Sequence, residues 1–253
     1  MRKAGMRTIA CAIMLGSLLM AGQPVLAEEG GFAPMHAGTD INNTQSLQRG
    51  ARNFMNYCSG CHSLKYLRYN RVAEDLGIPE AELRANLMFT ADKVFSTIET
   101  AMPAESETWF GKQPPDLSLM ARARGLDYLY SFLHGFYADA ARPWGTNNLY
   151  LPSAAMPDVL QGLQGLQKPV FKSEDDASGG AHMVLTGVEM MTPGSMKPEE
   201  FDGFVRDLVN FLDYAGEPVK AERQALGVWV MLFLLVFFVF AYLLKKEYWK
   251  DVH

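Results

Sequence analysis

The chain has 253 residues, of which 49% are apolar and 20% are charged, and this balance excludes an intrinsically disordered or collagen-like protein. The formal net charge of −5 argues against general binding to nucleic acid, whose phosphates attract basic proteins. Three cysteines are too few for a small fold that depends on several disulfides.

Residues 1–27 have the layout of a secretory signal peptide. Basic residues at positions 2, 3 and 7 precede an apolar run from Thr8 to Met20, and Ala27 closes a stretch of small and apolar residues that suits a leader peptidase. The apolar run is too short to span a bilayer stably. We therefore expect cleavage after Ala27 and export of the residues that follow. Loss of the three basic residues would move the formal charge from −5 to −8.

Between residues 28 and 215, three segments show the spacing of amphipathic helices. They are residues 46–57, with Ser46 as a candidate N-cap, residues 126–137, and residues 198–214, which begin with a proline and carry two glutamates in the first turn. The apolar faces that would pack in a core consist of Leu47, Ala51, Phe54 and Met55, of Leu126, Leu129, Leu133 and Phe136, and of Phe201, Phe204, Val205, Leu208, Phe211 and Leu212.

No two segments show the alternating pattern of paired strands, so we expect a mainly α fold. Residues 102–116 and 142–169 contain scattered prolines and glycines and are predicted to be loops. Residues 173–180 are predicted to form an exposed acidic turn. Long loops are uncommon inside a compact domain, but a large apolar cofactor at its centre would account for them.

Residues 226–244 contain no charge over 19 positions, and as a helix they would span roughly 28 Å, close to the hydrocarbon thickness of a bilayer. A buried core helix is a poor alternative, because no face of this segment is polar. Together with the leader, the segment predicts a single-pass protein of the cell inner membrane. Residues 28–215 would form a periplasmic domain, residues 216–225 a linker, and residues 245–253 a cytoplasmic tail.

The predicted periplasmic domain has two cysteines, and both belong to the sequence Cys58-Ser59-Gly60-Cys61-His62. This C-x-x-C-H spacing is the attachment pattern of c-type haem. Two thiols three residues apart can form thioethers with the two vinyl groups on one edge of the porphyrin, and the adjacent imidazole can bind the iron. We therefore predict one covalently bound haem c, attached through Cys58 and Cys61 and ligated by His62.

Two other uses of a C-x-x-C pair fit less well. A disulfide oxidoreductase would need a strand–helix context, and that context is missing here. A structural zinc site needs about four ligands, and the domain has no second cysteine pair. The third cysteine, Cys11, lies in the predicted leader at the start of its apolar run, whereas a lipoprotein cysteine would lie at the end.

The residues alone leave the second axial ligand open. A methionine ligand usually comes from an ordered loop, and both Met102 and Met156 precede a proline that holds them extended. His134 lies on an aromatic helix face and is expected to be packed or solvent-facing rather than iron-bound. A protein ligand would make the haem an electron carrier, whereas an open iron would suit a peroxidase or a gas sensor.

With these motifs in place, the sequence resembles the cytochrome c1 family, the haem subunits of the bacterial cytochrome bc1 complex (ubiquinol–cytochrome c reductase). The resemblance covers nearly the whole chain after the leader. It rests on the ordered set SLQRGARNFMNYCSGCHSLKYLRY, PPDLSLMARARG, GTNNLYLPSAAMP and DLVNFLDYAGEP, followed by one apolar span and a basic tail. It implies that Met156, rather than Met102, is the second axial ligand.

The resemblance implies further roles and a fold. Pro115 resembles the family proline that packs beside the haem, and Arg124, with Arg122 as the near alternative, resembles the arginine that pairs with a haem propionate. Tyr128 falls near the family's haem-side tyrosine. The implied fold is an all-α c-type cytochrome domain with loop insertions plus one C-terminal transmembrane helix. Some members carry an additional cysteine pair, which this chain lacks.

The function that the resemblance implies is one-electron transfer, for which no catalytic acid, base or nucleophile is required. A Rieske iron–sulfur protein would deliver the electron, a soluble or membrane-bound cytochrome c would collect it, and the span would hold the haem domain beside cytochrome b. The acidic surface would steer a basic acceptor. Two alternatives are a membrane-tethered c-type carrier of another respiratory chain, and a haem peroxidase or gas sensor with an exchangeable iron ligand.

Overall fold

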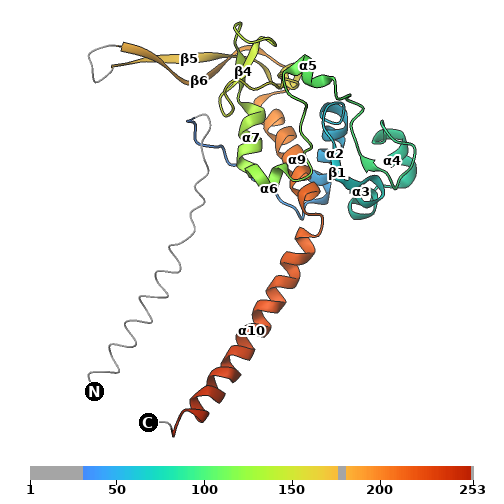
Figure 1. Cartoon of the computed structure of the whole chain (residues 1–253), viewed down its shortest axis with the longest axis vertical. Helices are drawn as coiled ribbons and strands as arrows, with labels where there is room; N and C mark the ends of the chain where they lie inside the picture. The colour runs from blue at the N-terminus through green and yellow to red at the C-terminus, as the bar shows by residue number, and fades with distance from the viewer. Residues whose placement is uncertain (1–30, 176–180, 252–253) are drawn as a thin grey trace.

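The computed structural model of the chain describes residues 31–175 and 181–251. The predicted signal peptide lies outside the described residues, as do residues 176–180 of the predicted acidic turn and the last two residues of the tail. Figure 1 shows a helical body from which a two-stranded ribbon extends at one end and a single long helix at the other.

The described residues contain more helix than strand, but three antiparallel strand pairs are also present there, so the prediction of a mainly α class is confirmed only in part. The helices are α2 (Thr44–Tyr57), α3 (Tyr69–Leu76), α4 (Glu80–Asn86), α5 (Ser106–Phe110), α6 (Met120–Arg124), α7 (Leu126–His134), α8 (Gln161–Gln164), α9 (Pro198–Gly216) and α10 (Lys220–Tyr248). The paired strands are β1 (Leu64–Arg68) with β2 (Thr97–Ile98), β3 (Phe136–Ala138) with β4 (Thr146–Asn148), and β5 (Gly165–Asp175) with β6 (Ala181–Pro193).

Helices α2 and α9 form the centre of the core, and the predicted apolar faces of both are buried. Phe54 of α2 and Phe211 of α9 are fully buried, with their ring centroids 5.9 Å apart. The two helices approach so closely that a Cβ atom at Gly50 would lie 2.1 Å from the carbonyl oxygen of Asp207. Only glycine therefore permits this crossing.

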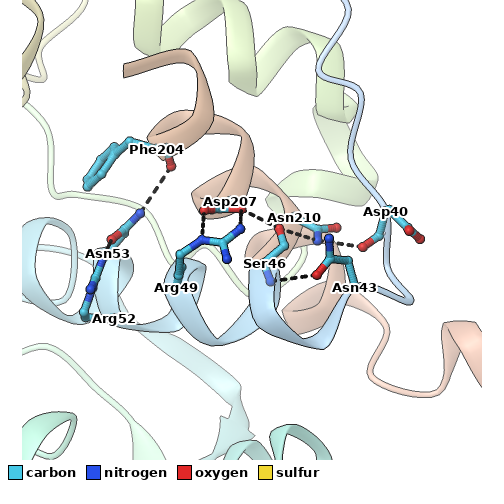
Figure 2. A network of polar contacts seen from close by, with 9 residues as sticks. All are labelled: Asp40, Asn43, Ser46, Arg49, Arg52, Asn53, Phe204, Asp207 and Asn210. Carbon is cyan, nitrogen blue, oxygen red and sulfur yellow. Dashed lines mark hydrogen bonds and ion pairs between the residues drawn. The ribbon is translucent and has the colours of Figure 1, made fainter. Parts of the chain in front are cut away.

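A buried polar network joins the same two helices, as Figure 2 shows. Asp207 accepts hydrogen bonds from the Ser46 hydroxyl at 2.6 Å and from the Arg49 guanidinium at 2.5 and 3.0 Å. The hydrogen bond to Asp207 raises the pKa of Arg49. The amide of Asn210 donates to the Asp40 carbonyl oxygen at 2.7 Å and to the Ser46 hydroxyl at 3.0 Å. The carboxylate thus ties α2 to α9 at the point of closest approach.

Helix α2 begins two residues before the predicted start, and Ser46 is not its N-cap. Asn43 caps the helix, because its side-chain oxygen accepts a hydrogen bond from the Ser46 backbone N–H at 3.1 Å. Serine and asparagine are equally good caps, so composition does not separate them. The Ser46 hydroxyl is used instead in the contact with Asp207.

The helix predicted at residues 126–137 is present as α7 but ends at His134. Phe136 belongs to β3, where it pairs with Asn148 of β4. Between the two elements, Gly135 lies so close to Tyr150 that a Cβ atom there would be 2.7 Å from a ring carbon. Phe136 is buried in this strand, so its apolar character fitted a helix and a strand equally well.

The expectation that the chain has no strand pair is wrong, because β5 and β6 form a long antiparallel hairpin. Its register shifts between Leu166 and Gln167 and again between Val170 and Phe171. Each irregularity interrupts the period-two alternation that identifies strands in a sequence, and Pro169 in β5 is a residue that strands usually avoid. Side chains from the middle of β6 pack against the small apolar cluster formed around β3 and β4.

Helix α10 contains the predicted span 226–244 and extends beyond it at both ends. It is long and apolar enough to cross a membrane, and no side chain of its most apolar window is buried within the chain. Figure 1 shows that it projects from the body just after α9. At the junction, Lys220 pairs with Asp213 at 2.7 Å and Arg223 pairs with Glu217 at 2.5 Å. These ion pairs fix the start of α10 to the end of α9.

Candidate functional site

The C-x-x-C-H motif forms a compact turn directly after α2. The backbone N–H groups of Cys58 and Ser59 both donate to the Phe54 carbonyl oxygen, at 2.8 and 3.0 Å, and so close the last turn of the helix. The N–H groups of Cys61 and His62 donate to the Cys58 carbonyl oxygen, at 3.0 and 2.8 Å. One short hydrogen-bonded segment therefore presents two thiols and an imidazole.

The two thiols are not joined in a disulfide. Burial, with a smaller effect of the neighbouring Cys61, raises the pKa of Cys58 to about 12, and burial also raises the pKa of Cys61. An environment that disfavours thiolates suits two uncharged thioethers, and it opposes both disulfide exchange and zinc binding. No cluster of three or more His, Cys, Asp or Glu side chains suited to a metal ion occurs in the described part of the chain. The donor set fits a covalently attached haem.

The segment that contains Pro115 fixes the imidazole of His62. Nδ1 of His62 lies 2.7 Å from the Pro115 carbonyl oxygen, and because a carbonyl oxygen can only accept, Nδ1 carries the proton. Nε2 then keeps its lone pair, which is the form of the ring that binds a metal. Burial lowers the pKa of His62 against the opposing effects of the Pro115 hydrogen bond and the charge of Asp116. The neutral ring is therefore favoured.

A second segment reaches the motif through Thr100, a residue that the sequence did not single out. Its hydroxyl donates to the Gly60 carbonyl oxygen at 2.8 Å, and its backbone N–H donates to the Ser63 hydroxyl at 2.9 Å. The Met102 backbone N–H in turn donates to the Thr100 hydroxyl at 3.0 Å. Thr100 thus ties the backbone of Met102 to the motif, although Gly60 and Ser63, the partners of Thr100, are distant in the sequence.

Met156 lies in the loop between β4 and α8, where it is half-buried. Two asparagines of the GTNNLY sequence shape this loop. Asn147 Oδ1 accepts from the Ser153 backbone N–H at 2.8 Å, and Asn148 Oδ1 accepts from the Tyr150 N–H at 2.9 Å. These bonds give the loop the order that a methionine ligand needs, and ligation by Met156 stays a prediction.

Arg124 and Tyr128 lie on either side of the α6–α7 junction and contact each other. The guanidinium carbon of Arg124 is 5.3 Å from the centroid of the Tyr128 ring, which also stacks on Phe132 at 6.3 Å. Arg124 is exposed and Tyr128 is half-buried. Arg122, the alternative for a propionate partner, is also exposed, and its side chain approaches Gly216 at the end of α9.

The predicted site residues thus fall into three groups: Cys58, Cys61, His62 and Pro115 at the motif, Arg124 and Tyr128 at the α6–α7 junction, and Met156 in the β4–α8 loop. His134 is packed within the protein. Its Nδ1 lies 2.8 Å from the Tyr130 carbonyl oxygen and its Nε2 lies 3.0 Å from the Asp202 carboxylate. Because both ring nitrogens are engaged, His134 is not available to bind iron.

Comparisons with known proteins identify the family of the chain. The family described as "Cytochrome C1 family" matches residues 36–105 and 88–252. Cytochrome c1 of Allochromatium vinosum is 48% identical to the chain over 242 residues, which cover 95% of the chain and 98% of that protein. The chain belongs to the cytochrome c1 family. The resemblance inferred from the sequence motifs is thereby confirmed.

The chain is also similar to two proteins that carry other names. The ammonia monooxygenase gamma subunit of Nitrosomonas europaea is 45% identical over 218 residues, which cover 86% of the chain and 88% of that protein. Cytochrome b/c1 of Bradyrhizobium diazoefficiens is 26% identical over 242 residues, which cover 82% of the chain and 33% of that longer protein. As a member of the cytochrome c1 family, the chain carries a covalent c-type haem and is a membrane-anchored electron-transfer subunit of a bc1 complex that also contains cytochrome b.

Proposed function

We propose that the chain relays single electrons from a Rieske iron–sulfur protein to a soluble or membrane-bound cytochrome c within ubiquinol–cytochrome c reductase. The observation that carries the proposal is the arrangement of His62, whose Nδ1 is committed to Pro115 while Nε2 keeps its lone pair beside two unbridged cysteines. When bound, the haem supplies a one-electron Fe(III)/Fe(II) couple.

The proposal assigns three kinds of role to side chains: covalent attachment, axial ligation and contact with the rest of the haem. In that order, the residues are Cys58 and Cys61, His62 and Met156, and Pro115, Arg124 and Tyr128. If His62 and Met156 both hold the iron, no position would be left for a small-molecule substrate. The protein residues bind and orient, and none of them makes or breaks a substrate bond.

The proposed topology follows from the two apolar ends of the chain. Residues 1–27 are a signal peptide, residues 28–215 a periplasmic haem domain, residues 216–225 a linker, residues 226–244 a transmembrane helix, and residues 245–253 a cytoplasmic tail. The exposure of α10 along its most apolar window supports a span of the cell inner membrane. Because α10 starts inside the linker and is ion-paired to α9, the haem domain would be held at a fixed distance from the membrane surface.

The experiment that tests the function is rapid-mixing spectroscopy of the solubilised, intact complex. Ubiquinol should reduce the haem while the Rieske protein is present and should fail to do so after the Rieske protein is extracted. A cytochrome c acceptor should re-oxidise the haem, more slowly at high salt because the acidic surface is then screened.

Two outcomes would contradict the proposal. Purification of the chain without cytochrome b and a Rieske protein would indicate a tethered carrier of another respiratory chain. Rapid binding of CO to the reduced, unmodified protein would indicate an open iron site, as in a peroxidase or a gas sensor.

A further inference from the structure

We propose that Asp116 is a positioning residue for His62: its carboxylate holds residues 115–118 against the backbone that follows the haem motif and thereby orients the Nδ1 hydrogen bond of the imidazole. The proposal rests on the proposed ligation of iron by His62. It concerns a residue that neither attaches nor ligates the haem.

Four hydrogen bonds join residues 62–66 to residues 115–118. With the donor named first, they are His62 Nδ1 to Pro115 O at 2.7 Å, Leu117 N to Ser63 O at 2.9 Å, Lys65 N to Asp116 Oδ2 at 2.9 Å, and Tyr66 N to Ser118 Oγ at 3.2 Å. The bond to the imidazole is the first in this row. Its geometry therefore depends on how the rest of the segment is held.

Asp116 uses both carboxylate oxygens in this arrangement. Oδ2 accepts the bond from Lys65, which crosses to the motif segment, and Oδ1 accepts from the Ser118 backbone N–H at 2.9 Å, which closes a turn in its own segment. Ser118 is fully buried near the end of α9, where a Cβ atom at Gly216 would lie 3.4 Å from the Ser118 carbonyl oxygen. The carboxylate therefore connects the motif segment to a fixed point in the core.

Asp116 bears on the imidazole through the segment that it holds, because Pro115, which accepts the His62 Nδ1 hydrogen bond, is its neighbour in the chain. A hydrogen-bonded Nδ1–H and a nearby negative charge both increase the electron density of an imidazole ligand, and a more basic ligand favours oxidised iron. Loss of Asp116 should therefore raise the midpoint potential of the haem. A residue that only filled space would not shift this potential.

The test compares Asp116→Asn with Asp40→Asn in the full-length chain within its membrane complex. Asp40 is a matched control, because its Oδ1 also accepts the backbone N–H two residues later at 2.9 Å, and within the described part of the chain no hydrogen bond joins its side chain to the motif segment. Asparagine at position 116 removes the charge, and its one side-chain oxygen cannot replace both acceptors. The readouts are the midpoint potential and the low-spin EPR spectrum of the oxidised haem.

We expect Asp116→Asn to raise the ratio of reduced to oxidised haem about tenfold at a fixed potential, which corresponds to about 59 mV for a one-electron couple. The EPR signal should also change, while Asp40→Asn should match the unmodified protein. An unchanged potential and EPR spectrum in Asp116→Asn would overturn the inference.

Pulsed EPR on protein with ¹⁵N-labelled histidine separates this failure from failure of the proposed function. Coupling of a histidine nitrogen to the iron in the unmodified protein, with no effect of Asp116→Asn, would overturn the positioning role and leave His62 as a ligand. Absence of that coupling would overturn both. If Asp116→Asn does not assemble, Ser118→Ala is tested in its place, because it removes the hydrogen bond from the Tyr66 backbone N–H to Ser118 Oγ. A smaller upward shift of the midpoint potential in Ser118→Ala supports the inference, and an unchanged potential overturns it.

Discussion

The α2–α9 crossing and the C-x-x-C-H turn are neighbours in the chain, yet they are stabilised in different ways. At the crossing, buried aromatic rings, a close approach at Gly50 and the Asp207 network hold two long helices together. At and just after the turn, hydrogen bonds from the side chains of Thr100 and Asp116 hold the backbone at Gly60 and Lys65. Substitutions at the crossing should therefore change the free energy of unfolding, whereas substitutions at the turn should change the haem and leave the fold intact.

The largest effect is expected at the closest approach of the two helices. Gly50→Ala should lower the free energy of unfolding by more than about 3 kcal/mol, because the new methyl group would overlap the Asp207 carbonyl oxygen and force the helices apart. Guanidinium denaturation followed by circular dichroism measures this change.

Gly203→Ala in α9 is the matched control, because a Cβ atom there meets nothing within 4 Å. It should stabilise the protein by about 0.5–1 kcal/mol through its better helix propensity. Equal stability of the two variants would show that the crossing is not as tightly packed as the structure indicates.

A smaller loss is expected from the polar network of the same crossing. Asp207→Ala leaves Arg49 and the buried Ser46 hydroxyl without their shared acceptor and should cost about 2–4 kcal/mol in denaturation experiments. Glu199→Ala, on the exposed first turn of α9, should cost less than about 1 kcal/mol. A loss at Asp207 no greater than that at Glu199 would mean that packing alone holds the crossing.

The smallest effect is expected at the edge of the core, where the Tyr214 hydroxyl donates to Asp75 at 2.8 Å. Burial and this contact raise the pKa of Tyr214. The unfolded chain therefore ionises first, so the hydroxyl contributes stability below about pH 10 that is lost as the pH rises further. Tyr214→Phe should cost about 1 kcal/mol at pH 7 and should lose less stability above pH 10.

Tyr66→Phe is the control for this pH dependence, because Tyr66 is 74% exposed. Its denaturation midpoints should follow those of the unmodified protein at both neutral and alkaline pH. If Tyr214→Phe loses as much stability above pH 10 as the unmodified protein does, ionisation of the Tyr214 hydroxyl is not the cause of that loss.

The parts of the fold that could be predicted are those in which one helix face repeats over several turns. The apolar spacings in α2 and α9 are continuous, so both helices were identified close to their bounds. The β5–β6 hairpin was missed because two register shifts and Pro169 break the alternation of its side chains. The end of α7 was missed because Gly135 is required there by Tyr150, a contact between residues that are not adjacent in sequence.

The site also has a part that the sequence predicts and a part that it does not. The spacing within Cys58–His62 is local and indicates haem attachment without any knowledge of the fold. The residues that fix the motif are not local: Thr100 is 40 residues from its partner Gly60, and Asp116 is 51 residues from Lys65. Such contacts arise from tertiary packing, and a single sequence carries no pattern for them.

The most direct test of His/Met-ligated electron transfer is the absorption spectrum and midpoint potential of Met156→Leu, with Met102→Leu as the control. Both methionines are half-buried and precede a proline. If Met156 ligates the iron, Met156→Leu should lose the six-coordinate low-spin spectrum, bind CO when reduced and have a lower potential, while Met102→Leu keeps all three properties of the unmodified protein. A six-coordinate low-spin spectrum with an unchanged potential in Met156→Leu would contradict this assignment.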